Sequence, residues 1–272
     1  MSDRVTITIT DGVADVRMVR VDKRNALDGA MFADLAAAGE ELKASKGVRA
    51  VVLSGDGPSF CAGLDFGSFQ QMAGGGGAGG GGNREGNPSA MAEGRITHLG
   101  QQVAWVWQEL PMPVIAAVHG HALGGGIQIA LGADIRIVHP DTQLSVREVH
   151  WGLVPDMTGT LMLSHLVRAD IAKELVFTAR VFDGREAFAI GLATRLSETP
   201  YDDAMAMATE IAGRSPDAVR GAKALINGLL HDRAAEQFEA ERRIIGSLIG
   251  GKNQVEAVMS NFEKRAPDFV DG

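Results

Sequence analysis

The sequence predicts an α/β core followed by a helical C-terminal region. Up to Val146, short apolar runs rich in β-branched residues alternate with segments of helical periodicity, and from Thr158 onward helical patterns dominate. Strands that alternate with helices and then give way to helices alone are typical of this architecture. We therefore expect residues 1–199 to form the core and residues 200–272 a helical region, in which the apolar faces of Ala234–Ile249 indicate subunit packing.

The chain begins with a predicted β-hairpin and a helix. Val5–Thr10 and Val13–Val19 alternate apolar and polar residues around Asp11-Gly12, which is a strong signal for a hairpin turn. Leu27–Leu42 then carries apolar residues at helical spacing, and Asp28 is a possible N-cap of that helix.

Further elements follow from the apolar pattern. Met91–Leu110 predicts a long helix that ends at Pro111, and Ile127–Leu131 predicts a buried helix. Ala73–Gly82 is nearly all glycine and predicts a flexible loop, for which a surface insertion is favoured over a mobile flap beside a pocket. Short apolar runs predict strands at Arg49–Leu53, Pro113–Val118, Ile135–Val138 and Gln143–Val146.

Composition indicates a globular protein of the cytoplasm. Of the 272 residues, 45% are hydrophobic and 22% are charged, as in ordinary soluble proteins. A net charge of -8 without a basic tract argues against nucleic acid or an anionic membrane as the main partner. We find no signal peptide and no apolar run long enough to span a bilayer. The single cysteine, Cys61, excludes an intrachain disulfide and fits a reducing compartment.

The segment His121–Gln128 is the most informative one in the chain. Three glycines lie between the buried strand that ends at Val118 and the predicted helix that follows. They allow close backbone approach, and the unpaired N–H groups of a helix start favour a negatively charged partner such as a developing oxyanion. Taken alone, the motif is equally compatible with a tight turn in which glycine serves packing only.

Two other motifs add to this one. Asn25-Ala-Leu27, Phe60-Cys-Ala-Gly-Leu-Asp65 and Gly120-His-Ala-Leu-Gly-Gly-Gly126 occur in this order. Together they closely resemble the N-A-L, F-x-A-G-x-D and G-x-A-x-G-G-G signatures of the enoyl-CoA hydratase/isomerase (crotonase) superfamily. The resemblance extends from about Val5 to Phe269. It implies a spiral of β-β-α units, an acyl-CoA thioester as substrate, no cofactor beyond the coenzyme A of that substrate, and a homotrimer or a dimer of trimers.

The resemblance also implies roles for individual residues. The backbone N–H groups of Ala62 and Gly125 would form an oxyanion hole for the thioester oxygen and so stabilise an enolate. Further residues are expected to contact the substrate: Arg24, Ala26, Gly63, Asp65, Gly124, His150 and Lys264, the last through a phosphate.

Acidic residues decide which reaction such a site performs. Hydratases of the superfamily carry two glutamates, whereas this chain has Gln128 at the first position and Glu148 at the second. An amide cannot exchange a proton at neutral pH. Asp156 adds another acid, and the segment Arg147–Asp156 partly resembles the dienoyl-CoA isomerase branch. We therefore assign Glu148, Asp156 and Gln128 as the catalytic group.

Each acid also has a plain structural interpretation. Glu148 lies between Arg147 and His150 and could be an ion-paired surface residue, and Asp156 could cap the helix predicted after it. The histidines show no metal-binding spacing of the His-Glu-x-x-His kind, and we expect no metal.

Three functions remain open from the sequence. The first is a double-bond isomerase for an enoyl-CoA or dienoyl-CoA that uses Glu148 and Asp156. The second is an enoyl-CoA hydratase in which Glu148 works alone and Gln128 only positions water. The third is a non-catalytic CoA-thioester-binding protein that has kept the fold without turnover. The retained Glu148 favours the first two, and Gln128 favours the first.

Overall fold

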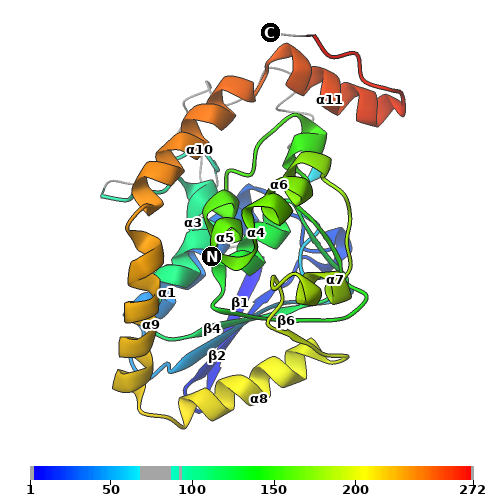
Figure 1. The fold of residues 1–272 in the computed structure, drawn as a ribbon. Helices are drawn as coiled ribbons and strands as arrows, with labels where there is room; N and C mark the ends of the chain where they lie inside the picture. The colour runs from blue at the N-terminus through cyan, green and yellow to red at the C-terminus, as the bar shows by residue number, and fades with distance from the viewer. Residues whose placement is uncertain (1–2, 68–86, 92–93, 271–272) are drawn as a thin grey trace.

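A computed structural model describes residues 3–67, 87–91 and 94–270. The predicted glycine loop at 73–82 lies outside these residues. A six-stranded sheet runs through the molecule in the order β1-β2-β3-β4-β6-β8 (Figure 1). β1 is antiparallel to β2, as the hairpin predicted, and the other pairs are parallel. The strands are β1 (Val5–Thr10), β2 (Val13–Met18), β3 (Ala50–Gly55), β4 (Val114–Val118), β6 (Ile135–Val138) and β8 (Arg195–Leu196).

A second, two-stranded sheet carries the glycine motif. β5 (His121–Leu123) pairs in parallel with β7 (Gln143–Ser145), and Cys61 forms an isolated bridge with Ala122. The sequence indicated β7 but not β5, because three residues before a glycine turn give no readable periodicity. This small sheet joins the Cys61 segment to the start of α4 (Gly125–Gly132).

Two helices show how local capping sets the boundaries. α1 (Gly29–Ala44) begins at Asp28, whose carboxylate accepts a hydrogen bond from Met31 N at 2.9 Å, as predicted. α3 (Leu99–Glu109) is shorter than the predicted helix from Met91. Its start is fixed by a reciprocal capping box between His98 and Gln101, and an antiparallel bridge between Met91 and His98 excludes a continuous helix there.

The sheet is covered on both faces. One face packs against α1, α3 and α4 in the main hydrophobic core, where Trp107 is fully buried. The other face is covered by α8 (Pro200–Ala212), in which Ala204, Ala208 and Ala212 recur every fourth residue and are buried against the strands. These small side chains let the helix axis approach the sheet closely. α8 therefore completes the core, although the sequence placed residue 200 at the start of a separate helical region.

Three helices form the C-terminal arm. In Figure 1, α9 (Pro216–His231) and α10 (Ala234–Leu248) run along one side of the molecule away from α8, and α11 (Lys252–Glu263) lies across the end opposite α8. Phe238 of α10 is fully buried and lies edge-on to Trp105 of α3, with ring centroids 4.8 Å apart. The arm is thus attached to the core of its own chain, while its predicted part in subunit packing stays a prediction.

Shorter helices complete the fold. None of the helices in the described part of the chain is long and apolar enough to cross a membrane. The remaining helices are the 3-10 segments η1 (Val21–Lys23) and η2 (Glu148–Trp151) together with α5 (Gly159–Leu166), α6 (Ala169–Thr178) and α7 (Gly184–Ala189).

Lys223 provides a test of how the arm is held. Its ammonium donates to Trp107 O at 3.1 Å, Met112 O at 3.0 Å and Asp134 Oδ2 at 2.7 Å, and burial lowers its pKa. Lys223→Met removes this donor from the Trp107 and Met112 carbonyls and leaves Asp134, which still accepts from Val114 N, without its counter-ion. We therefore expect the free energy of unfolding to fall by about 3 kcal/mol. Urea unfolding measures this, with the exposed Lys173→Met as control. Equal losses in both variants would contradict the prediction.

Candidate active site

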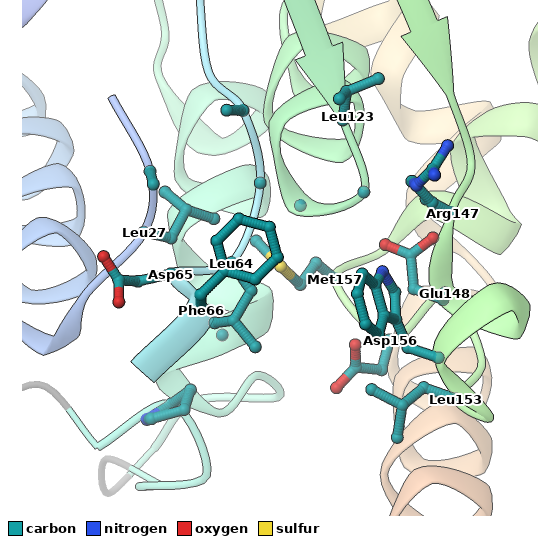
Figure 2. Close-up of a pocket in the computed structure, with 18 of the residues that line it drawn as sticks. Leu27, Leu64, Asp65, Phe66, Leu123, Arg147, Glu148, Leu153, Asp156 and Met157 are labelled. Atoms are coloured by element: carbon teal, nitrogen blue, oxygen red, sulfur yellow. The ribbon is translucent and has the colours of Figure 1, made fainter. Parts of the chain in front are cut away.

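A pocket of about 1230 Å³ lies where the motif segments meet (Figure 2). Its walls come from η1, the segment after β3, the start of α4, η2, the segment before α5, and the helices α10 and α11. Most of the residues that the sequence assigned to binding or catalysis line this pocket. They are Arg24, Ala26, Ala62, Gly63, Asp65, Gly124, Gly125, Glu148, His150 and Asp156. Gln128 lies behind the wall, and Lys264 is an exposed C-cap of α11 that does not line the pocket.

The glycine turn places one free amide at the pocket. Gly124, at φ +54°, donates its own N–H to Ser145 O at 2.9 Å. Gly125 is the first residue of α4, and within the described chain its N–H has no acceptor. A Cβ at this position would lie 2.7 Å from Leu27 Cδ1 and 2.9 Å from Met157 Sδ. Glycine is therefore required here by close packing as well as by the exposed amide.

The second amide of the predicted oxyanion hole is not that of Ala62. The N–H of Ala62 donates to Arg24 O at 2.9 Å, so it is already used. In the neighbouring parallel bridge, Leu27 N donates to Gly63 O at 2.8 Å and Asp65 N donates to Leu27 O at 3.0 Å. The amide between them belongs to Leu64, which lines the pocket and has no acceptor among the described residues. The assignment of Ala62 was wrong because the motif does not reveal the hydrogen-bond register of its extended chain.

Glu148 is held by a fixed amide. The carboxylate lies at the start of η2, is 8% exposed, and accepts a hydrogen bond from Gln128 Nε2 at 2.6 Å through Oε1. Gln128 Oε1 in turn accepts from Met157 N and Gly159 N, each at 3.0 Å, which leaves only its NH2 group to face Glu148. Glu148 Oε2 has no protein partner in the described structure. The interpretation of Glu148 as an ion-paired surface residue is therefore wrong, and Gln128 acts as a support that does not reach the pocket.

Asp156 faces the same pocket. The helix that follows, α5, has Thr158 as its N-cap residue, so the alternative in which Asp156 caps a helix is wrong. In Figure 2 the Asp156 and Glu148 carboxyl groups lie on one wall, opposite the two bridged segments that carry Leu27 and Leu64. The two acids thus line one pocket and Gln128 contacts Glu148 from behind its wall, while their catalytic role stays a prediction.

The environment raises the pKa of both acids. Burial raises the pKa of Glu148 to about 7, against the opposing effect of its hydrogen bonds. Burial, followed by the nearby charge of Glu148, raises the pKa of Asp156 to about 8. Near neutral pH one carboxyl can therefore be ionised while the other carries a proton. Such a pair can act as general base and general acid.

Other residues expected at the substrate are bound to protein or lie at the rim. Asp65 accepts from Arg20 Nη1 at 2.8 Å and from Gly67 N at 2.9 Å, so its carboxylate anchors the motif segment. His150 is exposed, and burial of the ring edge lowers its pKa. A role of Lys264 at a phosphate stays a prediction.

An aromatic cluster on the pocket wall was not predicted from the sequence. Trp151 of η2, Phe66 after the second motif and Phe262 of α11 lie with ring centroids 6.3 to 6.4 Å apart. All three line the pocket. They come from segments far apart in the chain, so no local pattern could have predicted their contact.

Comparison with known proteins fits this geometry. The sequence profile of the enoyl-CoA hydratase/isomerase family matches residues 8–272. The chain belongs to this family. Its members are enzymes that act on acyl-CoA thioesters, in agreement with the expected substrate class.

Individual relatives cover nearly the whole chain. The chain is 30% identical to mouse mitochondrial methylglutaconyl-CoA hydratase over 265 residues, which cover 95% of this chain and 79% of the relative. It is 29% identical to a probable enoyl-CoA hydratase of Bacillus subtilis (strain 168), with 90% of each covered. The crystal structure of an enoyl-CoA hydratase/isomerase from Pseudoalteromonas atlantica T6c superposes with a TM-score of 0.85 at 27% identity, covering 98% of this chain and 100% of that one. The predicted crotonase fold is confirmed.

The two free amides can be tested one atom at a time. Replacing Leu64 with leucic acid, its α-hydroxy analogue, turns the amide into an ester and removes only the N–H group. If this N–H stabilises the thioester oxyanion, turnover of an enoyl-CoA falls by about 100-fold. The matched control is lactic acid at Ala62, which removes the bond to Arg24 O and should leave turnover near that of the wild type. A larger loss at Ala62 than at Leu64 would restore the original assignment.

Proposed function

We propose that the protein is an isomerase that shifts the double bond of an enoyl-CoA or dienoyl-CoA. The observation that supports this most is the pair of pocket acids, Glu148 and Asp156, backed by an amide at position 128. Moving a double bond requires removal of a proton at one carbon and delivery at another, and this pair suits both steps.

The proposed mechanism uses the described groups directly. The N–H groups of Leu64 and Gly125 bind the thioester oxygen and stabilise the enolate that forms when a proton leaves the carbon chain. Glu148 Oε2, which has no hydrogen-bond partner among the described residues, removes that proton as the C–H bond of the substrate breaks. The electron pair moves along the conjugated system, and a new C–H bond forms at a different carbon with a proton from Asp156. Glu148 then returns its proton to Asp156, which restores both acids.

The hydratase alternative is favoured by the names of relatives, since those at about 30% identity are called hydratases. In this reaction Glu148 would have to activate water without help. Gln128 is a poor candidate for positioning that water, because both lone pairs of its carbonyl oxygen are used by Met157 N and Gly159 N. We therefore keep hydration as the second candidate.

Coenzyme A would be the only cofactor-like group, as part of the substrate. We expect its adenine and pantetheine to border Arg24, Ala26 and Gly63, with the thioester beside Gly124. We also expect a homotrimer or a dimer of trimers.

Substrate comparison tests the proposal. Purified protein is assayed with crotonyl-CoA for hydration and with a 3-enoyl-CoA and a 3,5-dienoyl-CoA for isomerisation. We expect kcat/KM for one of the isomerisations to exceed that for hydration. Efficient hydration without isomerisation would establish the second candidate, and binding without turnover of any of the three would indicate a non-catalytic thioester-binding protein.

Glu148→Gln isolates the proposed base. The amide keeps the shape of the side chain and can still accept from Gln128 Nε2, but it cannot take a proton. We expect turnover to fall by about 100-fold or more while affinity for a CoA thioether analogue, measured by calorimetry, stays near that of the wild type. Turnover at the level of the wild type would remove Glu148 from the mechanism.

The pH profile tests the second acid. Activity should rise as Glu148 ionises near pH 7 and fall as Asp156 loses its proton near pH 8, which gives a narrow bell. In Asp156→Asn the group responsible for the alkaline limb is gone, so the remaining activity should stay level above pH 8. An unchanged alkaline limb in this variant would exclude Asp156 as the proton donor.

A further inference from the structure

The turn that carries Asp156 is held by two side chains from different helices. Its three successive backbone amides, those of residues 157, 158 and 159, all donate to side-chain oxygens. Gln128 of α4 accepts from Met157 N and Gly159 N, and Glu241 of α10 accepts from Thr158 N at 3.1 Å. Thr158 has φ +67°, a conformation that residues with a Cβ rarely adopt. The turn therefore depends on these external acceptors to keep its shape.

Glu241 is buried and faces donors only. It is 3% exposed, and besides Thr158 N it accepts from Thr160 Oγ1 at 2.7 Å and from Gln101 Nε2 at 3.0 Å. Gln101 is itself fixed, because its Oε1 accepts from His98 N and from Arg242 Nη1. Burial raises the pKa of Glu241, while the three donors around its carboxyl group oppose that rise and favour the ionised form.

Among the described residues, four titratable or charged groups lie near Glu241, and they come from α10, the start of α3 and the pocket wall. Arg242 of the same helix reaches Gln101, while no Lys or Arg forms an ion pair with Glu241 in the described part of the chain. His98 at the start of α3 is neutral near pH 7, because burial and then the charge of Arg242 lower its pKa to about 4. Glu148 and Asp156 on the pocket wall are the remaining acids, and the charge of Glu241 adds to the rise of both pKa values.

We propose that Glu241 is a positioning residue for Asp156. Glu241 fixes the turn 156–159 against α10 and keeps the Asp156 carboxyl in the protonated form that the reaction uses. The inference rests on the proposed function, in which Asp156 delivers a proton. Glu241 does not line the pocket, so it acts only through the turn and through its charge. Because α10 also supplies Arg242 and Ile245 to the pocket, the same helix forms part of the pocket wall and holds the turn that carries Asp156.

A purely structural role for Glu241 makes different predictions. In that case its loss would lower stability and reduce activity by the same factor at every pH, with or without Asp156. A positioning role moves the alkaline limb of the pH profile and depends on Asp156 being present.

Glu241→Gln and the exposed Glu239→Gln on the same helix form a matched pair. Removal of the Glu241 charge lowers the pKa of Asp156 and that of Glu148, so we expect both limbs of the profile to move to lower pH and kcat above pH 8 to fall about tenfold, with KM nearly unchanged. Glu239→Gln should match the wild type. In the Asp156→Asn background, Glu241→Gln should have little further effect on kcat. An equal loss of kcat at every pH, or the same loss in the Asp156→Asn background, would overturn the proposal.

A titration without turnover separates this inference from the proposed function. Carbon-13 NMR of the labelled Asp156 carboxyl should show a lower pKa in Glu241→Gln and no change in Glu239→Gln. An unchanged Asp156 pKa overturns the positioning role, whatever reaction the site performs. A lowered pKa with Asp156→Asn fully active supports the positioning role and contradicts the proposed function. If Glu241→Gln does not fold, Thr160→Val is the second variant. It removes one donor that stabilises the ionised form of Glu241, so it should also lower the pKa of Asp156.

Discussion

The hydrogen bond from Gln128 Nε2 to Glu148 Oε1 is the contact on which the site depends. It puts a neutral donor against a buried carboxylate, whose second oxygen has no hydrogen-bond partner in the part of the chain that the structure describes. The orientation of the Gln128 amide is set by two backbone N–H groups of the turn before α5. A carboxylate at position 128 would put two acids in direct contact, and their shared proton would alter the titration of the whole pair.

The same turn connects parts of the chain that are far apart in sequence. Gln128 comes from the helix after the glycine motif, Glu148 from η2, and Glu241 from the C-terminal arm. Gln128 and Glu241 accept from the backbone of residues 157–159, and Glu148 is tied to the same turn through Gln128, so the position of Asp156 reflects all three segments. This explains how a buried acid in α10, outside the pocket, belongs to the same polar network as the pocket acids.

The backbone sites follow a similar logic. The backbone N–H groups of Leu64 and Gly125 remain free at the pocket, whereas the N–H groups of nearby residues are already used. Ala62 N donates to Arg24 O, Asp65 N to Leu27 O, and Gly124 N to Ser145 O. A free amide is thus defined by the pairing around it. The packing of Leu27 and Met157 against Gly125 then excludes any residue larger than glycine at the start of α4.

The sequence by itself determined the α/β core, most strand positions, the family and the glycine turn, and it singled out Glu148, Asp156 and Gln128 as candidates, because these follow from local periodicity and from ordered motifs. Only the tertiary structure decided which amides remain free, that Gln128 supports Glu148 from behind the pocket wall, that α8 covers the sheet, and that Glu241 reaches the turn. Each of these depends on the partner that a group meets across a long separation in the chain. Such partners are selected by packing and hydrogen-bond register, for which neighbouring residues carry no signal.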